Sequence, residues 1–530
     1  MSFRSVYGKS PLVRLGLTFA LLLGGALCLH AQTGGAAADA AETQNSDSQS
    51  AGGAVPAATG VDSTIDMKEN PPVTGLDEPI FERAFGERSY LLPQAELSES
   101  LDTNFLGSFT SRSATAVTRG VGSIDLEKLW RRHPLDLSYV AGFDAFHGQG
   151  GRVDLIQSLA VTQRFLWRTG QLALRDTFSY LPQGNFAFSA FGGEGTFGGS
   201  GGLGGLGGLG GFGGGGGGVG GGGVGGLGTP GFGNVLFGSV GLQSRIANMA
   251  IVDVTQSLSQ RSSIVLAGGY GLTSFLGTPT VSVLCPTSAQ CYFNSNQTIG
   301  QVGYNYQISR GNQIGVSYAY QEFHFPGITA GSINANVWQL QYAHRITGRL
   351  NFRLGGGPEL IKTHQTQLIP LSSVIIIPIT TSGTFLSGSA RAGISYEVSP
   401  RTSFTLDYMR FVNAGSGVFG GANTDTITAS VNRNLKRTWS MLLSGGYSRN
   451  SRLLTVNAPI AGNASSFQYG FADVALRRQL GREFGLFLSY QYSNYGFGSG
   501  YCSTTRCPSS YGRQIISAGL DWRPRPLRLD

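Results

Sequence analysis

Eleven charged side chains are spaced so that they could share one surface of a sheet and act on ions or polar solutes. They stand in segments where apolar residues alternate with small polar ones, a period of two that is typical of a β-strand. Side chains two positions apart in a strand share a face, so we predict that these charges lie on the polar face. The candidates are Asp136, Asp144, Asp154, Arg164, Arg175, Asp253, Arg353, Arg391, Glu397, Asp407 and Asp521. Both signs occur, so the set predicts no ring of a single charge.

The histidines offer no recognisable catalytic arrangement. Apart from His30 the chain has five, and none stands in a pattern with Ser, Asp or Glu that indicates a nucleophile and its base. No spacing of possible ligands indicates a metal site either. The five are His133, His147, His324, His344 and His364. We therefore predict that the protein is not an enzyme and has neither a cofactor nor a bound metal.

Beyond Cys28, the cysteines form two close pairs, Cys285 with Cys291 and Cys502 with Cys507. The N-terminus indicates export, as described below, and exported chains meet an oxidising compartment. We therefore expect each pair to form a disulfide within its own loop. A metal site built from all these thiolates is the alternative. It is less favoured because neither pair has the C-x-x-C spacing of zinc sites.

The clearest structural element is a hairpin in residues 297–325. Both halves alternate apolar and small polar residues, and the turn cluster Arg310-Gly311-Asn312 separates them. Folding about Gly311 brings both apolar sets to one face, as a stable antiparallel register requires. The predicted cross-strand pairs are Ile308 with Ile314, Tyr306 with Val316, and Tyr304 with Tyr318.

The same pattern recurs along the chain and predicts eighteen strands. They are 94–106, 115–129, 135–145, 153–166, 171–181, 246–258, 262–275, 297–309, 312–325, 335–347, 349–363, 384–399, 402–412, 424–435, 438–450, 466–480, 483–495 and 513–523. In 466–480 the aromatic residues have one parity and the aliphatic residues after them have the other. We expect a β-bulge in this strand to account for the change.

Short connections alternate with long ones. The short ones contain these basic residues: Arg131, Arg132, Arg168, Arg261, Arg310, Arg349, Arg401, Lys436, Arg437 and Arg482. The long ones cover 182–245, 276–296, 364–383, 451–465 and 496–512. Alternate connections of a meander lie at opposite ends of the sheet. One end should therefore carry short turns and the other long loops, and an even number of strands puts both termini at the short-turn end.

The ends of the chain and one insertion differ in composition from the strands. Residues 1–31 predict a secretory signal peptide, because basic residues precede an apolar run too short to span a bilayer. Residues 32–93 are acidic and of low complexity, and they predict a flexible linker. Residues 184–233 form a Gly-rich loop, for which a surface position is favoured over a position inside the barrel. Residues 524–530 are expected to form a short tail.

The net charge of +8 is unevenly distributed. Residues 1–31 carry +3 and residues 32–100 carry −9, which leaves +14 for the rest of the chain. The basic residues of the short connections supply most of this excess. We expect them to lie against lipid phosphates. Attraction of anions to a pore mouth is the alternative, and no nucleic-acid partner is expected.

Several features favour a membrane barrel over a soluble sandwich. The strands are long, and their polar face is made of Gly, Ser, Thr, Gln and Asn with few Lys or Glu. Closure into a barrel also removes the edges of so wide a sheet. With the signal peptide and the alternating connections, residues 94–523 resemble the porin-like outer-membrane β-barrel proteins of Gram-negative bacteria. In that family the last strand usually ends in an aromatic residue that the assembly machinery reads, whereas here Trp522 is followed by Arg523 to Asp530.

The resemblance implies an all-β fold: a transmembrane antiparallel up-and-down β-barrel of about 16–18 strands, with short periplasmic turns and long extracellular loops. It places the protein in the bacterial outer membrane and the linker in the periplasm. It also implies a channel for passive diffusion of small hydrophilic solutes. A non-conducting structural or adhesive surface protein is the alternative. A polysaccharide export conduit is less favoured, because no stripe of one charge is evident. The implied partners are outer-membrane lipid, small hydrophilic solutes and the outer-membrane assembly machinery, whereas the oligomeric state is not indicated.

Overall fold

The computed structural model describes residues 89–104, 114–130, 133–147, 152–181, 245–276, 294–309, 311–326, 331–347, 349–370, 376–399, 401–414, 419–454, 465–498, 510–522 and 524–529. The predicted signal peptide, almost all of the predicted linker and the Gly-rich loop lie outside these residues. So do Cys285, Cys291, Cys502 and Cys507. The expectations for these segments and for the disulfides therefore stay predictions.

The described residues form one antiparallel β-sheet. Its strands are β1 (Tyr90–Asp102), β2 (Thr115–Lys128), β3 (Leu135–Phe146), β4 (Val153–Trp167), β5 (Gly170–Leu181), β6 (Arg245–Ser259), β7 (Ser262–Phe275), β8 (Ser295–Ser309), β9 (Asn312–Phe325), β10 (Gly331–Thr347), β11 (Leu350–Pro370), β12 (Ile376–Ser399), β13 (Thr402–Asn413), β14 (Ala422–Lys436), β15 (Trp439–Arg452), β16 (Ser466–Leu480), β17 (Phe484–Phe497), β18 (Ser510–Trp522) and β19 (Leu527–Arg528).

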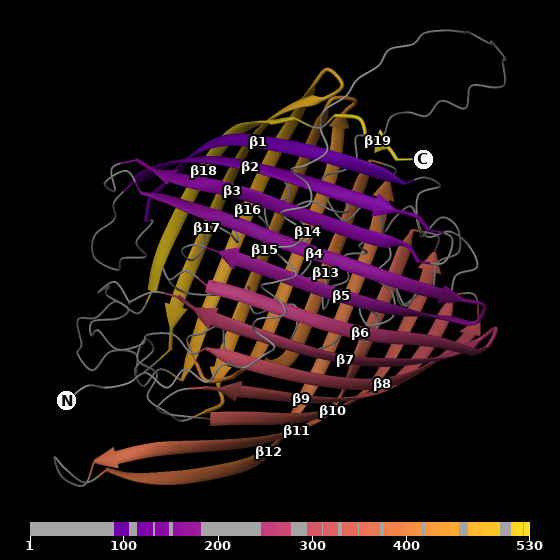
Figure 1. The fold of residues 1–530 in the computed structure, drawn as a ribbon, viewed down its shortest axis with the longest axis vertical. Helices are drawn as coiled ribbons and strands as arrows, with labels where there is room; N and C mark the ends of the chain where they lie inside the picture. Colours follow the sequence, from indigo (N-terminus) through magenta and orange to yellow (C-terminus); the bar gives the residue numbers. More distant parts are fainter. Residues whose placement is uncertain are drawn as a thin grey trace, which may run out of the picture. The chain divides into compact units, whose positions relative to one another are not determined.

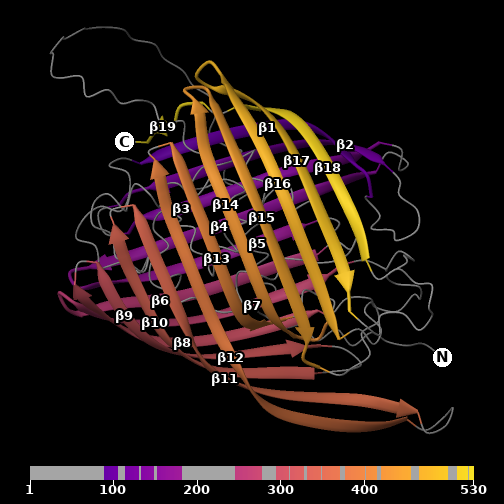
Figure 2. The same ribbon diagram turned by 180° about the vertical axis from the view of Figure 1, so that it is seen from behind.

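The sheet closes on itself. Each strand from β1 to β18 pairs with its neighbours in sequence, and β18 pairs back to β1. In Figure 1, β2 to β8 cross in front of the steeply inclined β14 to β17, and Figure 2 shows the same arrangement from behind. The described chain is therefore a closed up-and-down barrel of eighteen strands, with β19 as a two-residue addition. The predicted fold class is confirmed.

Alternation along each strand separates an outer from an inner face. In β1, Leu97 and Leu101 are 58% and 46% exposed, whereas their neighbours Glu96, Ser98 and Ser100 are buried. The exposed leucines face outward and their buried polar neighbours face the interior, as the period of two requires. The strand pattern therefore sends apolar side chains outward and polar side chains inward around the barrel.

The short turns share a local hydrogen-bond and bulge motif that was not predicted from the sequence. In four of them a Ser or Thr hydroxyl accepts a hydrogen bond from the backbone N–H two residues later, as in the bond from Gly311 to Ser309. An exposed aliphatic residue comes just before that Ser or Thr and is bulged out of the ladder, and the β14–β15 turn has the same bulge. The five bulged residues are Leu258, Ile308, Ile346, Val398 and Leu435.

The bulge at Ile308 corrects the predicted register of the β8–β9 hairpin. Tyr306 lies opposite Ile314 rather than Val316, and Tyr304 lies opposite Val316 rather than Tyr318. The turn closes between Ser309 and Asn312, so β9 is displaced by two residues relative to the prediction. A displacement of two residues keeps every side chain on its own face. The predicted outer face of this hairpin is therefore correct although its pairs are not.

The bulge predicted in 466–480 is absent from β16. Its registers with β15 and β17 run without a shift. Phe467 and Tyr469 face inward and are buried, whereas Val474 faces outward and is exposed. The change of hydrophobic parity marks an apolar patch inside the barrel and needs no extra residue.

Both ends of the barrel sequence extend beyond the predicted boundaries. β1 begins at Tyr90, inside the predicted linker, and its first residues reach beyond the end of β18. The tail supplies β19, which pairs Leu527 with Leu91 and Arg528 with Tyr90. The Leu529 N–H also donates to the Ser89 carbonyl. The tail therefore covers backbone groups of β1 that β18 leaves without a neighbour.

The predicted loop 364–383 is mostly strand. β11 and β12 pair continuously out to Pro370 and Ile376. The neighbouring strands stop earlier, because β10 pairs with β11 only up to Gln365 and β13 pairs with β12 only up to Ala390. The hairpin therefore extends beyond both neighbours, as Figures 1 and 2 show.

Closure of the sheet leads to a prediction for gel mobility. A closed barrel leaves no ladder edge on which unfolding can begin, so it should resist a denaturing detergent until heated. We expect unheated and boiled samples to migrate at different positions on a denaturing gel. Identical mobility of the two samples would contradict the closed barrel.

Candidate functional site: the inner wall of the barrel

The inner wall is lined by polar side chains from every part of the barrel. Buried polar or charged residues occur on the inner faces of strands from β1 to β18. Many carry a charge, and burial of an isolated charge is costly unless an opposite charge compensates it. The pairing of these charges therefore determines what the wall offers to a solute.

Neighbouring strands bring opposite charges together. Arg119 on β2 donates from Nε and one terminal nitrogen to the two carboxylate oxygens of Asp144 on β3, at 2.6 and 2.7 Å. Arg175 on β5 lies 3.0 Å from Asp253 on β6. All four side chains are buried. These contacts neutralise the charges locally and join adjacent strands across the inner face.

Two other pairs reach across an intervening strand. Arg477 on β16 contacts Asp521 on β18, and between them lies Gly485 of β17. A Cβ at Gly485 would come within 2.5 Å of the Asp521 carboxylate. Glycine is therefore needed at this position, because any side chain there would occupy the path of the ion pair.

The same arrangement recurs on β11 to β13. Arg353 lies 3.3 Å from Asp407, and both residues flank Gly393 of β12. A Cβ at Gly393 would stand 2.6 Å from the Asp407 carboxylate. Arg391, two residues before the glycine, also faces inward. The barrel thus uses one geometry twice to join charges on alternate strands.

The remaining predicted candidates lie nearer the ends of strands. Arg164 lies 3.6 Å from Asp136, whose side chain is partly exposed. Asp154 accepts a hydrogen bond from Arg152 at 2.8 Å. The Glu397 backbone N–H donates to the Arg349 carbonyl at the β10–β11 turn. These residues face the interior but do not form one cluster.

Several inner charges were not among the residues predicted from the sequence. The missed residues are Glu96, Asp102, Arg119, Asp125, Glu359, Asp473, Arg477 and Arg513. Six of them lie in β1, β2 or β16, and in β16 the apolar parity changes. Arg513 has the same parity as Asp521, which was a candidate, so that signal was present in the sequence.

Asp102 and Arg513 join the first and last strands of the barrel wall. The Arg513 side chain donates to Asp102 from Nε at 2.8 Å and also from a terminal nitrogen. The Asp102 side chain is 0% exposed and the Arg513 side chain is 2% exposed. The Asp102 carboxylate also accepts the backbone N–H of Asn104 at 3.0 Å. This pair stabilises the junction that closes the sheet.

Beside this pair lies a group of aromatic rings on the inner face of β16 to β18. The ring centroids of Tyr495 and Tyr511 are 4.7 Å apart with nearly parallel planes, and Tyr469 lies 4.8 Å from Tyr495. A second apolar cluster on β9 to β11 includes Phe323 and Ile333. Both groups lie toward the end of the long loops. They add apolar patches to the polar wall at this end.

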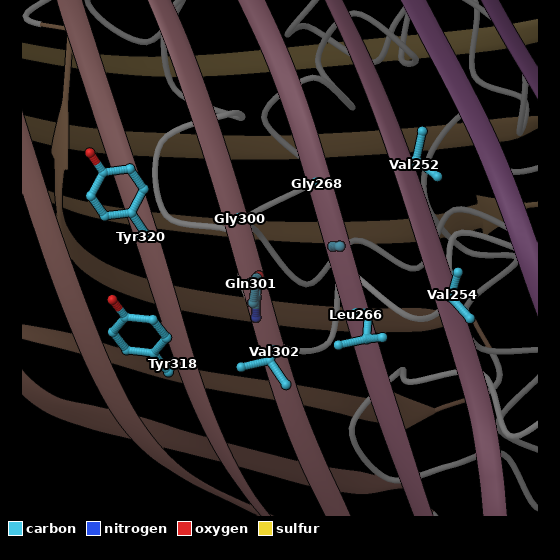
Figure 3. A pocket seen from close by; sticks show the side chains of 10 residues that line it. Val252, Val254, Leu266, Gly268, Gly300, Gln301, Val302, Tyr318 and Tyr320 are labelled. Carbon is cyan, nitrogen blue, oxygen red and sulfur yellow. The ribbon is translucent and has the colours of Figure 1, made fainter.

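A shallow hollow also exists, but it is on the outer surface. Its volume is about 580 Å³, and it is lined by residues of β6 to β9 that include Val252, Leu266, Val302 and Tyr318. Figure 3 shows these side chains around Gly268 and Gly300, which lie on two neighbouring strands. Most of the lining side chains are outward-facing and apolar, although Gln301 and Ala267 of the inner face also border the hollow. The hollow therefore opens on the outer surface.

The outer surface around the whole barrel is apolar. Large exposed hydrophobic side chains occur on the outer faces of strands throughout the wall. Such a belt on a soluble protein would be a very large exposed apolar patch, whereas in a bilayer it is covered by lipid. A closed barrel satisfies its backbone hydrogen bonds internally, as a bilayer requires. The described chain is a membrane-spanning β-barrel.

No family model matches the sequence of this barrel, and no curated protein matches it. The ferric-catecholate import receptor Fiu from E. coli K12 is 8% identical over 84% of this chain and 82% of its own, with a TM-score of 0.41. OccK2 from Pseudomonas aeruginosa is 7% identical over 83% and 99%, with a TM-score of 0.36. The FrpB iron transporter from Neisseria meningitidis is 7% identical over 83% of each chain, with a TM-score of 0.38. These similarities are too weak to assign a substrate.

The described ranges contain no helix long and apolar enough to cross a membrane. Within the same ranges, no group of three or more His, Cys, Asp or Glu side chains is placed to hold a metal ion. The described inner wall carries ion pairs, amides and hydroxyls.

Proposed function

We propose that this outer-membrane barrel is a channel for the passive diffusion of small hydrophilic solutes. The observation that carries the proposal is the inner face, to which strands from β1 to β18 contribute buried polar side chains and which contrasts with the apolar outer face. Barrels of this strand number enclose an interior wide enough for an aqueous path. Polar walls lower the cost of moving a hydrated solute through such a path.

The charges of the inner wall support a channel with little preference between anions and cations. Arg119, Arg175 and Arg477 each contact a carboxylate across the strands. Each pair has no net charge, so its field falls off quickly and does not concentrate ions of one sign. We therefore propose that hydrophilicity and size, rather than charge, decide passage.

Removing one member of a lumenal ion pair should make the channel prefer ions of one sign. Arg353 and Asp407 are suited to this test, because their side chains are 23% and 16% exposed and solvent moderates the cost of breaking the pair. Asp407→Asn leaves the arginine charge uncompensated and should shift the reversal potential in a KCl gradient toward anion selectivity. Arg353→Gln should shift it toward cation selectivity.

Purified protein in planar bilayers provides the measurement. The wild type should form discrete conductance steps with a reversal potential near zero. Arg449→Gln on the outer face is the matched control and should leave the reversal potential unchanged. Absence of conductance steps in the wild type would reject the channel and favour the alternative of a structural or adhesive surface protein.

One observation favours that alternative. The β11–β12 hairpin extends beyond β10 and β13, so its outer part carries ladder edges with no neighbouring strand. An exposed strand edge is a surface on which another chain can pair. A surface role and a channel are separated by the conductance measurement.

A further inference from the structure

The inner wall has two chemically distinct parts. The charges described above lie on the inner faces of β11 to β13 and of the strands from β16 through β18 and on to β6. On the described inner faces of β7 to β10, between Ser263 and Ala343, there is no charged side chain. The only described charged residue between those positions, Glu322, lies on the outer face of β9.

Carboxamide side chains take the place of charges on this part of the wall. They come from three adjacent strands, β8, β9 and β10, and we call them the amide wall. Its members are Gln301, Asn305, Gln313, Gln321, Gln339 and Gln341. Each carboxamide carries both a donor and an acceptor.

Neighbouring strands support part of the amide wall. The Gln339 amide donates to the Ser389 hydroxyl at 3.2 Å, and the Ser389 hydroxyl donates to the Gly357 carbonyl at 3.2 Å. The Gln341 amide lies 3.4 Å from the Gln339 carbonyl oxygen and 3.5 Å from the Ser317 hydroxyl. These contacts orient the two glutamines of β10 while leaving further donor and acceptor capacity.

Asn305 stands out within the amide wall. It is 2% exposed, yet neither its amide nitrogen nor its carbonyl oxygen has a hydrogen-bond partner among the described residues. The side-chain carbonyl oxygen of Gln301, four residues before Asn305 on the same face, also has no hydrogen-bond partner among the described residues. Buried polar groups are nearly always satisfied, so unmet groups on a transport wall indicate a place for a polar ligand.

A glycine on the adjacent strand accommodates the Asn305 side chain. Gly315 lies opposite Asn305 in the ladder, and Gly355 follows two strands on, beyond Gln341. A Cβ at Gly315 would come within 2.4 Å of the Asn305 carbonyl oxygen. The asparagine side chain therefore lies across the glycine, which no larger residue would permit.

We propose that the amide wall binds neutral polyhydroxylated solutes, that is sugars or polyols, as they pass through the barrel. The proposal rests on the proposed channel function and names its preferred substrate class. A sugar hydroxyl both donates and accepts, as each carboxamide does, so adjacent amides can satisfy adjacent hydroxyls in pairs. An ion would gain little here, because the amide wall itself carries no charge, whereas an apolar solute would leave the amides unsatisfied.

The test is the block of ion current by sorbitol in planar bilayers. Wild-type channels in KCl should show a reversible decrease of current as sorbitol is added, measured against a betaine solution of equal viscosity. Asn305→Leu keeps the approximate size of the side chain and removes both its donor and its acceptor. It should raise the half-blocking sorbitol concentration about 2–10-fold, the range expected for one net hydrogen bond, while channels still form.

Gln491→Leu is the matched control. Gln491 also has an unpartnered carbonyl oxygen on the inner face, but on β17, within the charged part of the wall. This variant should keep the wild-type half-blocking concentration. The proposal would be overturned if both variants raised the half-blocking sorbitol concentration equally, or if betaine blocked the current as strongly as sorbitol. It would also be overturned if wild-type channels conducted but were not blocked by sorbitol. Each of these results would leave the proposed channel function intact. A protein that forms no conducting channel would overturn both.

Discussion

Replacing Asp102 by Ala should destabilise the barrel by about 3–5 kcal/mol, the range for removing one member of a buried ion pair. The loss leaves the Arg513 guanidinium, which is 2% exposed, without its carboxylate. It also removes the acceptor of the Asn104 backbone N–H. Because the pair joins β1 to β18, the damage falls on the junction that closes the sheet.

Urea unfolding of the refolded barrel, followed by the gel mobility of unheated samples, measures this loss. The double variant Asp102→Leu with Arg513→Met should recover much of the stability, because it removes both charges together. Asp425→Ala is the control for an exposed pair. Its partner Arg410 lies 3.9 Å away with both side chains over a third exposed, so its loss should cost less than about 1 kcal/mol. Equal costs for Asp102→Ala and Asp425→Ala would contradict the assigned role of the junction.

Tyr304→Arg should cost about 2–4 kcal/mol if its side chain lies near the bilayer midplane. Tyr304 is 43% exposed on the outer face of β8, between Val302 and Tyr306, which are also exposed. An arginine there would meet acyl chains, which offer no hydrogen bonds to its charge. The same substitution on a water-exposed sheet would cost little, so the experiment tests which medium covers this face.

Refolding into phospholipid vesicles and unfolding in urea gives the free energies. Tyr304→Leu is the matched variant, because it keeps an apolar side chain and should fall within about 1 kcal/mol of the wild type. If the arginine and leucine variants were equally stable, the outer face of β8 would not be lipid-facing. That result would remove the basis for the membrane orientation of the whole barrel.

The barrel architecture was predictable from local pattern alone. Alternation with period two assigns each side chain to a face without reference to any partner strand. Short turns with Gly, Asn and basic residues mark where strands reverse, and their alternation with long loops separates the two ends. This is why residues such as Tyr304, Asp144 and Asp253 could be assigned to the outer or the polar face before any pairing was known.

The register could not be predicted to the residue. The aliphatic bulge before each Ser or Thr turn changes the pairing, yet it leaves the periodicity of the strands intact. Folding about Gly311 therefore placed Tyr306 opposite Val316, whereas Ile314 is its neighbour. The recurrence of an aliphatic residue followed by Ser or Thr at Leu258, Ile308, Ile346 and Val398 was a usable signal.

The sequence by itself determined the strands, their faces and the membrane as their medium, because these depend on composition and spacing within single segments. Only the tertiary structure decided which charges neutralise each other. Arg513 meets Asp102 through closure of the sheet, and Arg477 meets Asp521 because Gly485 leaves space between them. Such contacts depend on register across several strands and on the small size of a third residue. The division of the inner wall into a charged part and an amide wall has the same origin, since it appears only when the strands are placed side by side.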